Sequence, residues 1–156
     1  MGKTKEEIEA GARIFGQAAH TLGIIGEAVL NAEPFTGREV IAQNIIPAIV
    51  LKAFSCELFI KSLAMSADIK KIHKLNELFH YLRPSDRAQI KSSVINIMAK
   101  NDEQYTEHNF SVDLDNVANA FVDWRYFYED TKSINLHFLN ALFDTLWNYK
   151  TPIEID

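Results

Sequence analysis

The sequence predicts an all-α protein, a bundle of four or five helices packed antiparallel or crossed. Apolar and polar residues nowhere alternate over a long stretch, and the hairpin dipeptides Asn-Gly and Asp-Gly are absent. The four prolines fall where helices are expected to begin or end. With 47% hydrophobic and 24% charged residues, the chain has the composition of a folded protein. A length of 156 residues suits a single helical domain over residues 1–156.

The first predicted helix covers about residues 4–31. Thr4 can cap its amino end because Glu7 follows three residues later, as in a capping box. Gly16, Gly23 and Gly26 each lower its stability by about 1 kcal/mol relative to alanine, so this helix needs packing partners. A loop is expected at residues 33–37.

The second predicted helix begins near Pro47 and covers about residues 47–66. At about 100° per residue, five apolar residues lie within about 60° of Glu57, so this acid occupies the middle of an apolar face. These residues are Val50, Ala53, Phe54, Ile60 and Ala64.

A short helix is expected at residues 73–82, where Pro84 stops it, and Ser85 is expected to cap a further helix that ends near Lys100. The polar residues 101–112 are expected to form a long connection that is mobile or functional.

The last two predicted helices cover the remaining chain. Asp113 or Asp115 opens one that continues to about Asp130, and Ser133 caps the final one, which ends near Tyr149.

Arg125 is the counterpart of Glu57, because it also lies in the middle of an apolar helix face. A lone buried charge costs several kcal/mol, so we expect Glu57 and Arg125 to meet. Each has an opposite charge four residues later, Lys61 and Glu129, which predicts a four-member network. The network either only fixes helix register or lines a cleft that positions a ligand. His73 either pairs at the start of its own helix or faces that cleft.

Three patches, in order, resemble HEPN domains (higher eukaryotes and prokaryotes nucleotide-binding). They read AFSCELFIKSL at residues 53–63, HKLNELF at 73–79 and FVDWRYFYE at 121–129, and the resemblance extends over about residues 10–149. It implies a four- or five-helix bundle, a homodimer, and work on RNA or nucleotides in prokaryotic defence, toxin–antitoxin or regulatory systems.

Many proteins of that family are metal-independent ribonucleases with an arginine and a histidine on a late helix, separated by four to six other residues. Arg125 lies at a comparable place, but Asp130, Thr131 and Lys132 occupy the positions where the histidine is expected. The resemblance therefore implies binding without the standard cleavage site. Arg13 and His20 have the required spacing, but they lie on the first helix, where the family motif does not occur.

No metal, cofactor or disulfide is expected. The histidines show neither HxxxH nor HExxH spacing, and no glycine-rich phosphate loop occurs. Cys56 is the single cysteine, in keeping with a reducing cytoplasm. The longest apolar run, residues 45–51, is too short to cross a membrane, and the amino end does not read as a signal peptide. A cytoplasmic location is therefore expected.

The distribution of charged and aromatic residues along the chain indicates which kinds of partner the protein could bind. The net charge is −5, yet residues 52–91 carry eight bases against four acids and residues 101–156 carry three against eleven. This division marks an anion-binding face, two faces that attract in an oligomer, or simply two solvated surfaces. Five of the eight residues at 121–128 are aromatic, which favours a dimer surface over a base-stacking platform.

These observations predict an HEPN-like helical module that binds RNA or a nucleotide and lacks the usual ribonuclease site. Two alternatives remain open. One is a metal-independent endoribonuclease in which Arg125 acts with a residue other than histidine, such as Glu129 or Tyr128. The other is an accessory module that binds only a partner protein.

Overall fold

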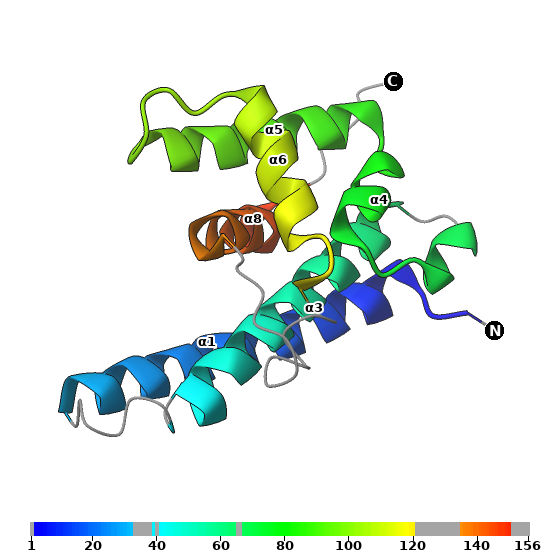
Figure 1. The fold of residues 1–156 in the computed structure, drawn as a ribbon. Helices are drawn as coiled ribbons and strands as arrows, with labels where there is room; N and C mark the ends of the chain where they lie inside the picture. The colour runs from blue at the N-terminus through cyan, green and yellow to red at the C-terminus, as the bar shows by residue number, and fades with distance from the viewer. Residues whose placement is uncertain (1, 33–38, 40, 65–66, 121–134, 151–156) are drawn as a thin grey trace.

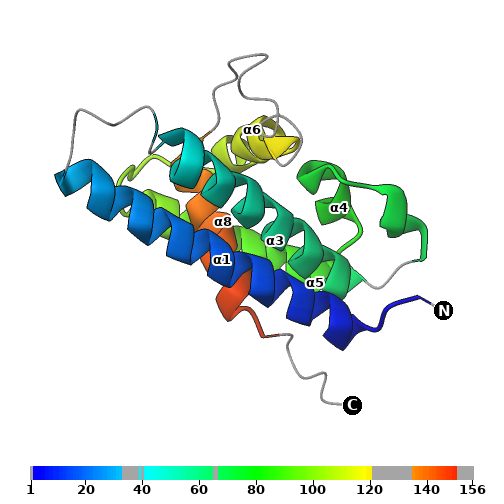
Figure 2. The ribbon, with the colours of Figure 1, turned by 90° about the horizontal axis from the view of Figure 1, so that it is seen from below.

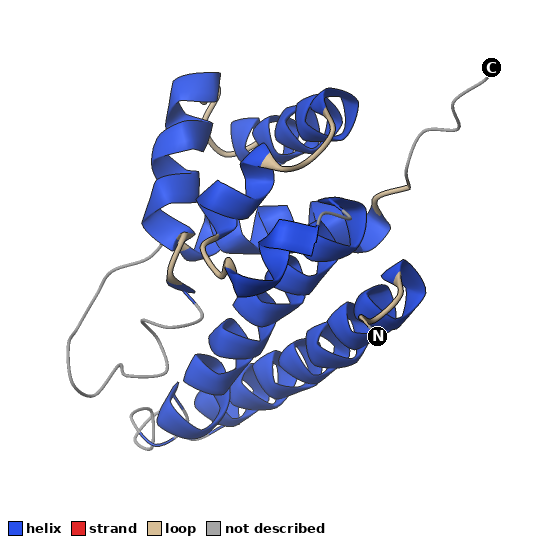
Figure 3. Ribbon diagram, turned by 90° about the vertical axis from the view of Figure 1, so that its right-hand side faces the viewer, coloured by secondary structure: helices blue, strands red, loops and turns tan. Residues whose placement is uncertain are grey.

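The computed structural model describes residues 2–32, 39, 41–64, 67–120 and 135–150. Figure 3 shows these residues as helices joined by short loops, without a strand in any of the described ranges. The predicted all-α class is confirmed. None of the described helices combines the length and the apolar character needed to cross a lipid bilayer.

Two long antiparallel helices form the base of the fold (Figures 1 and 2). They are α1 (Lys5–Ala32) and α3 (Ile46–Ala64), and the π-helix η2 (Ile41–Ile45) leads into α3. The predicted cap of α1 is present: the Thr4 backbone N donates to Glu7 Oε2 at 2.7 Å, and the Glu7 backbone N donates to Thr4 Oγ1 at 3.2 Å. The sequence thus predicted the start of this helix and the residues that stabilise it.

Gly16 permits the close approach of α1, α3 and the last described helix, α8 (Leu136–Asn148). A Cβ at Gly16 would lie 2.8 Å from the Phe143 ring and 2.9 Å from Ser55 Oγ. Next to this contact, Ser55 Oγ donates to the Ala12 carbonyl at 2.6 Å. The glycine that weakens α1 as an isolated helix is therefore the residue that lets three helices pack at this point.

Three shorter helices complete the described fold: α4 (Leu75–His80), α5 (Pro84–Ala99) and α6 (Glu107–Val117). Helix α8 crosses the α1 and α3 pair, and α5 lies on its other side (Figure 1). Helices α4, α6 and α8 meet in a row of rings, in which the Phe110 centroid lies 5.5 Å from that of Phe79 and 5.4 Å from that of Phe138. These rings are buried and join helices that are distant in the sequence.

The helix starts differ from those predicted. Pro84 opens α5 rather than only stopping the helix before it, so the N-cap is Arg83 and not Ser85. Helix α6 begins at Glu107, because the Thr106 side chain and Asn109 form a capping box inside the stretch predicted to be a connection. That prediction for residues 101–112 is wrong in its second half.

The final helix also has a different cap. Asn135 caps α8, since its side chain accepts a hydrogen bond from the Phe138 backbone N at 3.0 Å. The predicted cap Ser133 and the predicted loop at residues 33–37 lie outside the described residues. The prediction of one helix from Asp113 or Asp115 to about Asp130 is wrong, because α6 ends at Val117 with Ala118 as its C-cap. Residues 121–130, which include Arg125, lie outside the described range.

Candidate functional site

Glu57 is buried, as its place on an apolar helix face predicted. Its side chain is 1% exposed, and its Oε1 accepts a hydrogen bond from Lys61 Nζ at 2.7 Å. The same oxygen lies 2.9 Å from His73 Nδ1. His73 lies in the link between the 3₁₀-helix η3 (Ala67–Lys71) and α4. Three of the five candidate site residues, namely Glu57, Lys61 and His73, therefore come together and join α3 to this link.

The second carboxylate oxygen of Glu57 has no such contacts. Oε2 is buried and meets no hydrogen-bond donor in the part of the chain that the structure describes. Leaving a buried polar atom unpaired costs about 1–3 kcal/mol, and more when the group is charged. The predicted partners Arg125 and Glu129 lie outside the described residues. Oε2 is the atom that remains for the predicted bond from Arg125.

The Glu57 cluster, meaning Glu57, Lys61 and His73, is poorly accessible to a ligand. The side chain of Lys61 is 11% exposed and its ammonium is paired with the carboxylate. Only His73, at 56%, offers a substantial surface. The geometry of these three residues therefore indicates a structural role, in which they hold α3 against the segment before α4.

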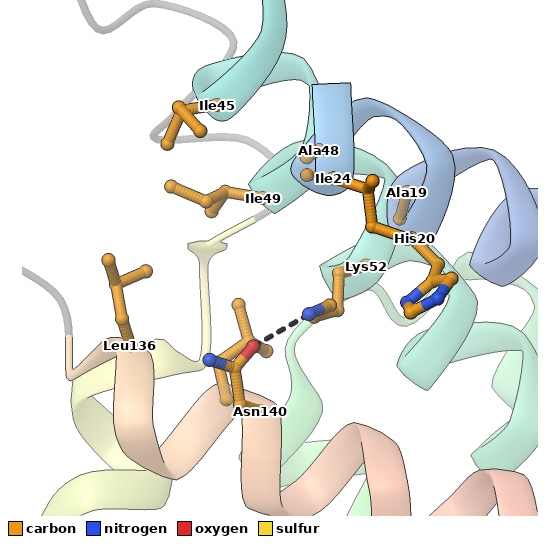
Figure 4. A pocket seen from close by; sticks show the side chains of 11 residues that line it. Ala19, His20, Ile24, Ile45, Ala48, Ile49, Lys52, Leu136 and Asn140 are labelled. Carbon is orange, nitrogen blue, oxygen red and sulfur yellow. Dashed lines mark hydrogen bonds between the residues drawn. The ribbon is translucent and has the colours of Figure 1, made fainter. Parts of the chain in front are cut away.

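A more open site lies between α1, α3 and α8, and we call it the Lys52 hollow. It has a volume of about 280 Å³, and its polar side chains are His20 from α1, Lys52 from α3 and Asn140 from α8. Figure 4 shows Lys52 pointing toward Asn140, with His20 on one side of their bond and apolar side chains on the other. The apolar lining includes Ile24, Ile45, Ile49, Leu136 and Leu139.

Lys52 gives this hollow a positive charge. Its Nζ donates to Asn140 Oδ1 at 2.7 Å and lies 5.2 Å from the centroid of the Phe143 ring. Neither the Asn140 amide nor the Phe143 ring carries a full negative charge, and no carboxylate is among the side chains that line the hollow. No sequence pattern marks Lys52 as a site residue, because its partner Asn140 is 88 residues away.

His20 also borders a second hollow of about 260 Å³ on the neighbouring surface of α1 and α8, together with Asp144 and Trp147. Arg13 reaches Trp147 from the same side of α1, with its guanidinium 5.0 Å from the indole centroid. That guanidinium also forms a 3.2 Å ion pair with Glu9. Arg13 is thus engaged in packing and pairing, whereas His20 is exposed.

The basic residues of the segment 52–91 do not gather in one cleft. Four of the eight form ion pairs with acids in the described part of the chain, and these four are distributed over α3, α5 and the residues that precede α4 and α5. These pairs are Lys61 with Glu57, Lys74 with Glu77, Arg83 with Asp86, and Lys91 with Glu107. The charge division seen in the sequence therefore does not by itself define a binding face.

A second buried carboxylate, Asp86 on α5, was not predicted from the sequence. Arg83 Nε donates to its Oδ2 at 2.8 Å, and Tyr149 Oη donates to its Oδ1 at 2.5 Å. Burial opposes ionisation of Asp86, but these hydrogen bonds outweigh burial and hold its pKa below the usual value. Burial and the same bond raise the pKa of Tyr149. The pair joins the start of α5 to the residue that follows α8.

Neither Cys56 nor the metal-ligating side chains of the described residues form a reactive centre. Burial raises the pKa of the Cys56 thiol well above its usual value, so the thiol stays protonated. Within the described ranges, no three histidine, cysteine or acidic side chains lie where they could hold a metal ion.

No family model matches the chain, and neither a curated protein nor a solved structure matches it. The resemblance to HEPN domains therefore depends on the three sequence patches alone.

Proposed function

We propose that the protein binds RNA or a nucleotide in the Lys52 hollow, as an HEPN-like helical module of a prokaryotic defence, toxin–antitoxin or regulatory system. The observation that carries the proposal is the position of Lys52. Its ammonium faces a hollow with apolar walls, and its nearest polar partner is a neutral amide. The ammonium group can bind a phosphate, and the apolar walls can pack against a nucleobase.

Size and composition agree with this ligand class. A volume of about 280 Å³ lies near the lower end of small-molecule sites, which run from about 300 to 1,000 Å³. A free nucleotide, or one nucleotide of a longer strand, has a size that fits this volume. His20 at the edge supplies a further donor to phosphate oxygens.

Binding without efficient cleavage is the expected outcome. Acid–base cleavage of RNA requires groups that exchange protons near neutral pH, and two such groups act together as acid and base. The lining of the Lys52 hollow includes one histidine and no carboxylate. The ribonuclease alternative based on Arg125 lies outside the described residues. A second candidate function is a metal-independent ribonuclease that uses His20, because His20 is exposed and lines the same hollow as Lys52.

A binding experiment with matched variants tests the proposal. We would titrate a fluorescent ten-nucleotide single-stranded RNA and the mononucleotide AMP at low salt, using the native chain, Lys52→Gln and Lys100→Gln. Lys100 is exposed near the end of α5 and serves as the charge-matched control. Lys52→Gln should weaken binding and lower the salt dependence by about one released ion, whereas Lys100→Gln should not.

The outcomes separate the candidates. Equal binding by Lys52→Gln and the native chain would contradict the proposed site. RNA cleavage that disappears in His20→Ala would favour the ribonuclease. No binding of either probe at low salt would favour an accessory module that binds only protein.

A further inference from the structure

We propose that a hollow between α4, α5 and α6 is a binding site for a small phosphate monoester. This Arg87 hollow has a volume of about 370 Å³ and contains three basic side chains, His80, Arg87 and Lys91. It shares no lining residue with the Lys52 hollow, so the inference does not depend on the proposed function.

Arg87 is held in position at the wall of the hollow. Its Nη1 donates to the backbone carbonyl of His80 at 3.1 Å, which fixes the guanidinium against the end of α4. No carboxylate forms an ion pair with Arg87 among the side chains that the structure describes. A guanidinium has five N–H donors in a planar fork, so it can still bind two phosphate oxygens together.

Lys91 lies one helical turn after Arg87 and therefore on the same face of α5. Its Nζ is 3.4 Å from Glu107 Oε2, and the Glu107 side chain is 78% exposed. Such surface ion pairs contribute little stability. A phosphate dianion in the hollow would compete successfully for the ammonium, since it also bonds to Arg87.

The opposite wall carries hydrogen-bond acceptors. Asp115 of α6 lines the hollow, and its Oδ1 accepts from Asn76 Nδ2 at 2.9 Å, while Ser111 lies one turn earlier on α6. Buried apolar side chains form the floor, namely Phe79, Phe110 and Leu114. The site thus suits a molecule with an anionic end and hydroxyl or amino donors at its other end.

The same acids disfavour a nucleic-acid strand. Asp115 within the hollow and Glu107 at Lys91 would repel the successive phosphates of a polyanion. A single phosphate can bind Arg87 and Lys91 by displacing the exposed Glu107 carboxylate toward solvent, and it can stay away from Asp115. This arrangement favours a monoester over RNA.

Calorimetric titration with glycerol 3-phosphate and with inorganic phosphate tests the inference. The monoester should bind saturably and more tightly than phosphate, because its glycerol hydroxyl groups can donate to the Asp115 wall while its phosphate binds Arg87 and Lys91. Arg87→Gln should weaken its binding by about tenfold or more, and Arg87→Lys, which keeps the charge but loses the fork, should give an intermediate loss. Lys100→Gln should bind it as the native chain does.

Three results would overturn the inference: no saturable binding of the monoester, equal binding by Arg87→Gln and the native chain, or binding of RNA that Arg87→Gln abolishes while the monoester fails to compete. A thermal melt of each variant verifies that it is folded. Failure of the proposed function would appear instead as unaltered RNA binding in Lys52→Gln, so the two failures are distinguishable.

Discussion

Tyr149 donates a hydrogen bond to Asp86, a residue 63 positions earlier, and so fastens the residue after α8 to the start of α5. The side chain of Asp86 is only 1% exposed, and Arg83 neutralises its charge from the solvent side. A buried carboxylate with these partners makes the stability of the protein depend on pH.

Acid should destabilise the protein through Asp86. Its pKa in the folded chain is lower than in the unfolded chain, so its contribution is complete above the ordinary aspartate value of about 4 and is lost as the pH falls through the folded value. Asp86→Asn should cost about 2–3 kcal/mol at neutral pH and reduce the loss of stability between neutral and acid pH. Urea unfolding at several pH values measures both effects. The exposed Asp144→Asn variant is the control, and an equal acid dependence in Asp86→Asn and the native chain would contradict the prediction.

Gly16→Ala should destabilise the fold. The added methyl group would lie 2.8 Å from the Phe143 ring, and relieving such an overlap in a packed core costs about 1–3 kcal/mol. Gly23 is the matched control on the same helix, since a Cβ there meets nothing within 4 Å. Gly23→Ala should stabilise the protein by up to about 1 kcal/mol, and thermal unfolding of the two variants should shift in opposite directions. Similar shifts would show that Gly16 is not a packing requirement.

Glu57 and Arg125 should be energetically coupled. Removing one partner of a buried charge pair costs about 3–5 kcal/mol, because the other is left unpaired, and removing both should cost less than the sum. The free Oε2 atom of Glu57 is where the contact is expected. A double-mutant cycle with Glu57→Gln and Arg125→Met measures the coupling. Strict additivity would refute the pairing.

The protein should be a dimer at micromolar concentration. Residues 121–128 contain more aromatic rings than one core can use, and they are expected to pack against a second copy. These residues lie outside the described ranges, so the expectation depends on the sequence. Light scattering should give twice the chain mass of 17.8 kDa. A mass of one chain throughout this range would contradict the prediction.

The sequence predicted interactions between residues that are close along the helix. The Thr4 cap and the burial of Glu57 follow from positions three or four residues apart, where helical geometry determines which side chains meet. The capping box at Thr106 was missed because Asn109 occupies the place usually taken by glutamate or glutamine.

Contacts across the fold could not be predicted in the same way. The bond from Lys52 to Asn140 depends on how α8 crosses α3, and neither residue has a local pattern that marks it. The Arg87 hollow depends on the packing of three helices. In both sites, no local sequence pattern distinguishes the candidate binding residues from other polar residues. They form a site only because the packing of the helices brings them together.

The position of Trp147 gives the molecule an optical reporter. Its indole contacts the Arg13 guanidinium and borders the same hollow as His20, next to the Lys52 hollow. The chain has two tryptophans, so Trp124→Phe leaves Trp147 as the single emitter. Fluorescence of this variant would then report any ligand or proton that reaches the surface between α1 and α8, without a label attached to the protein or to the ligand.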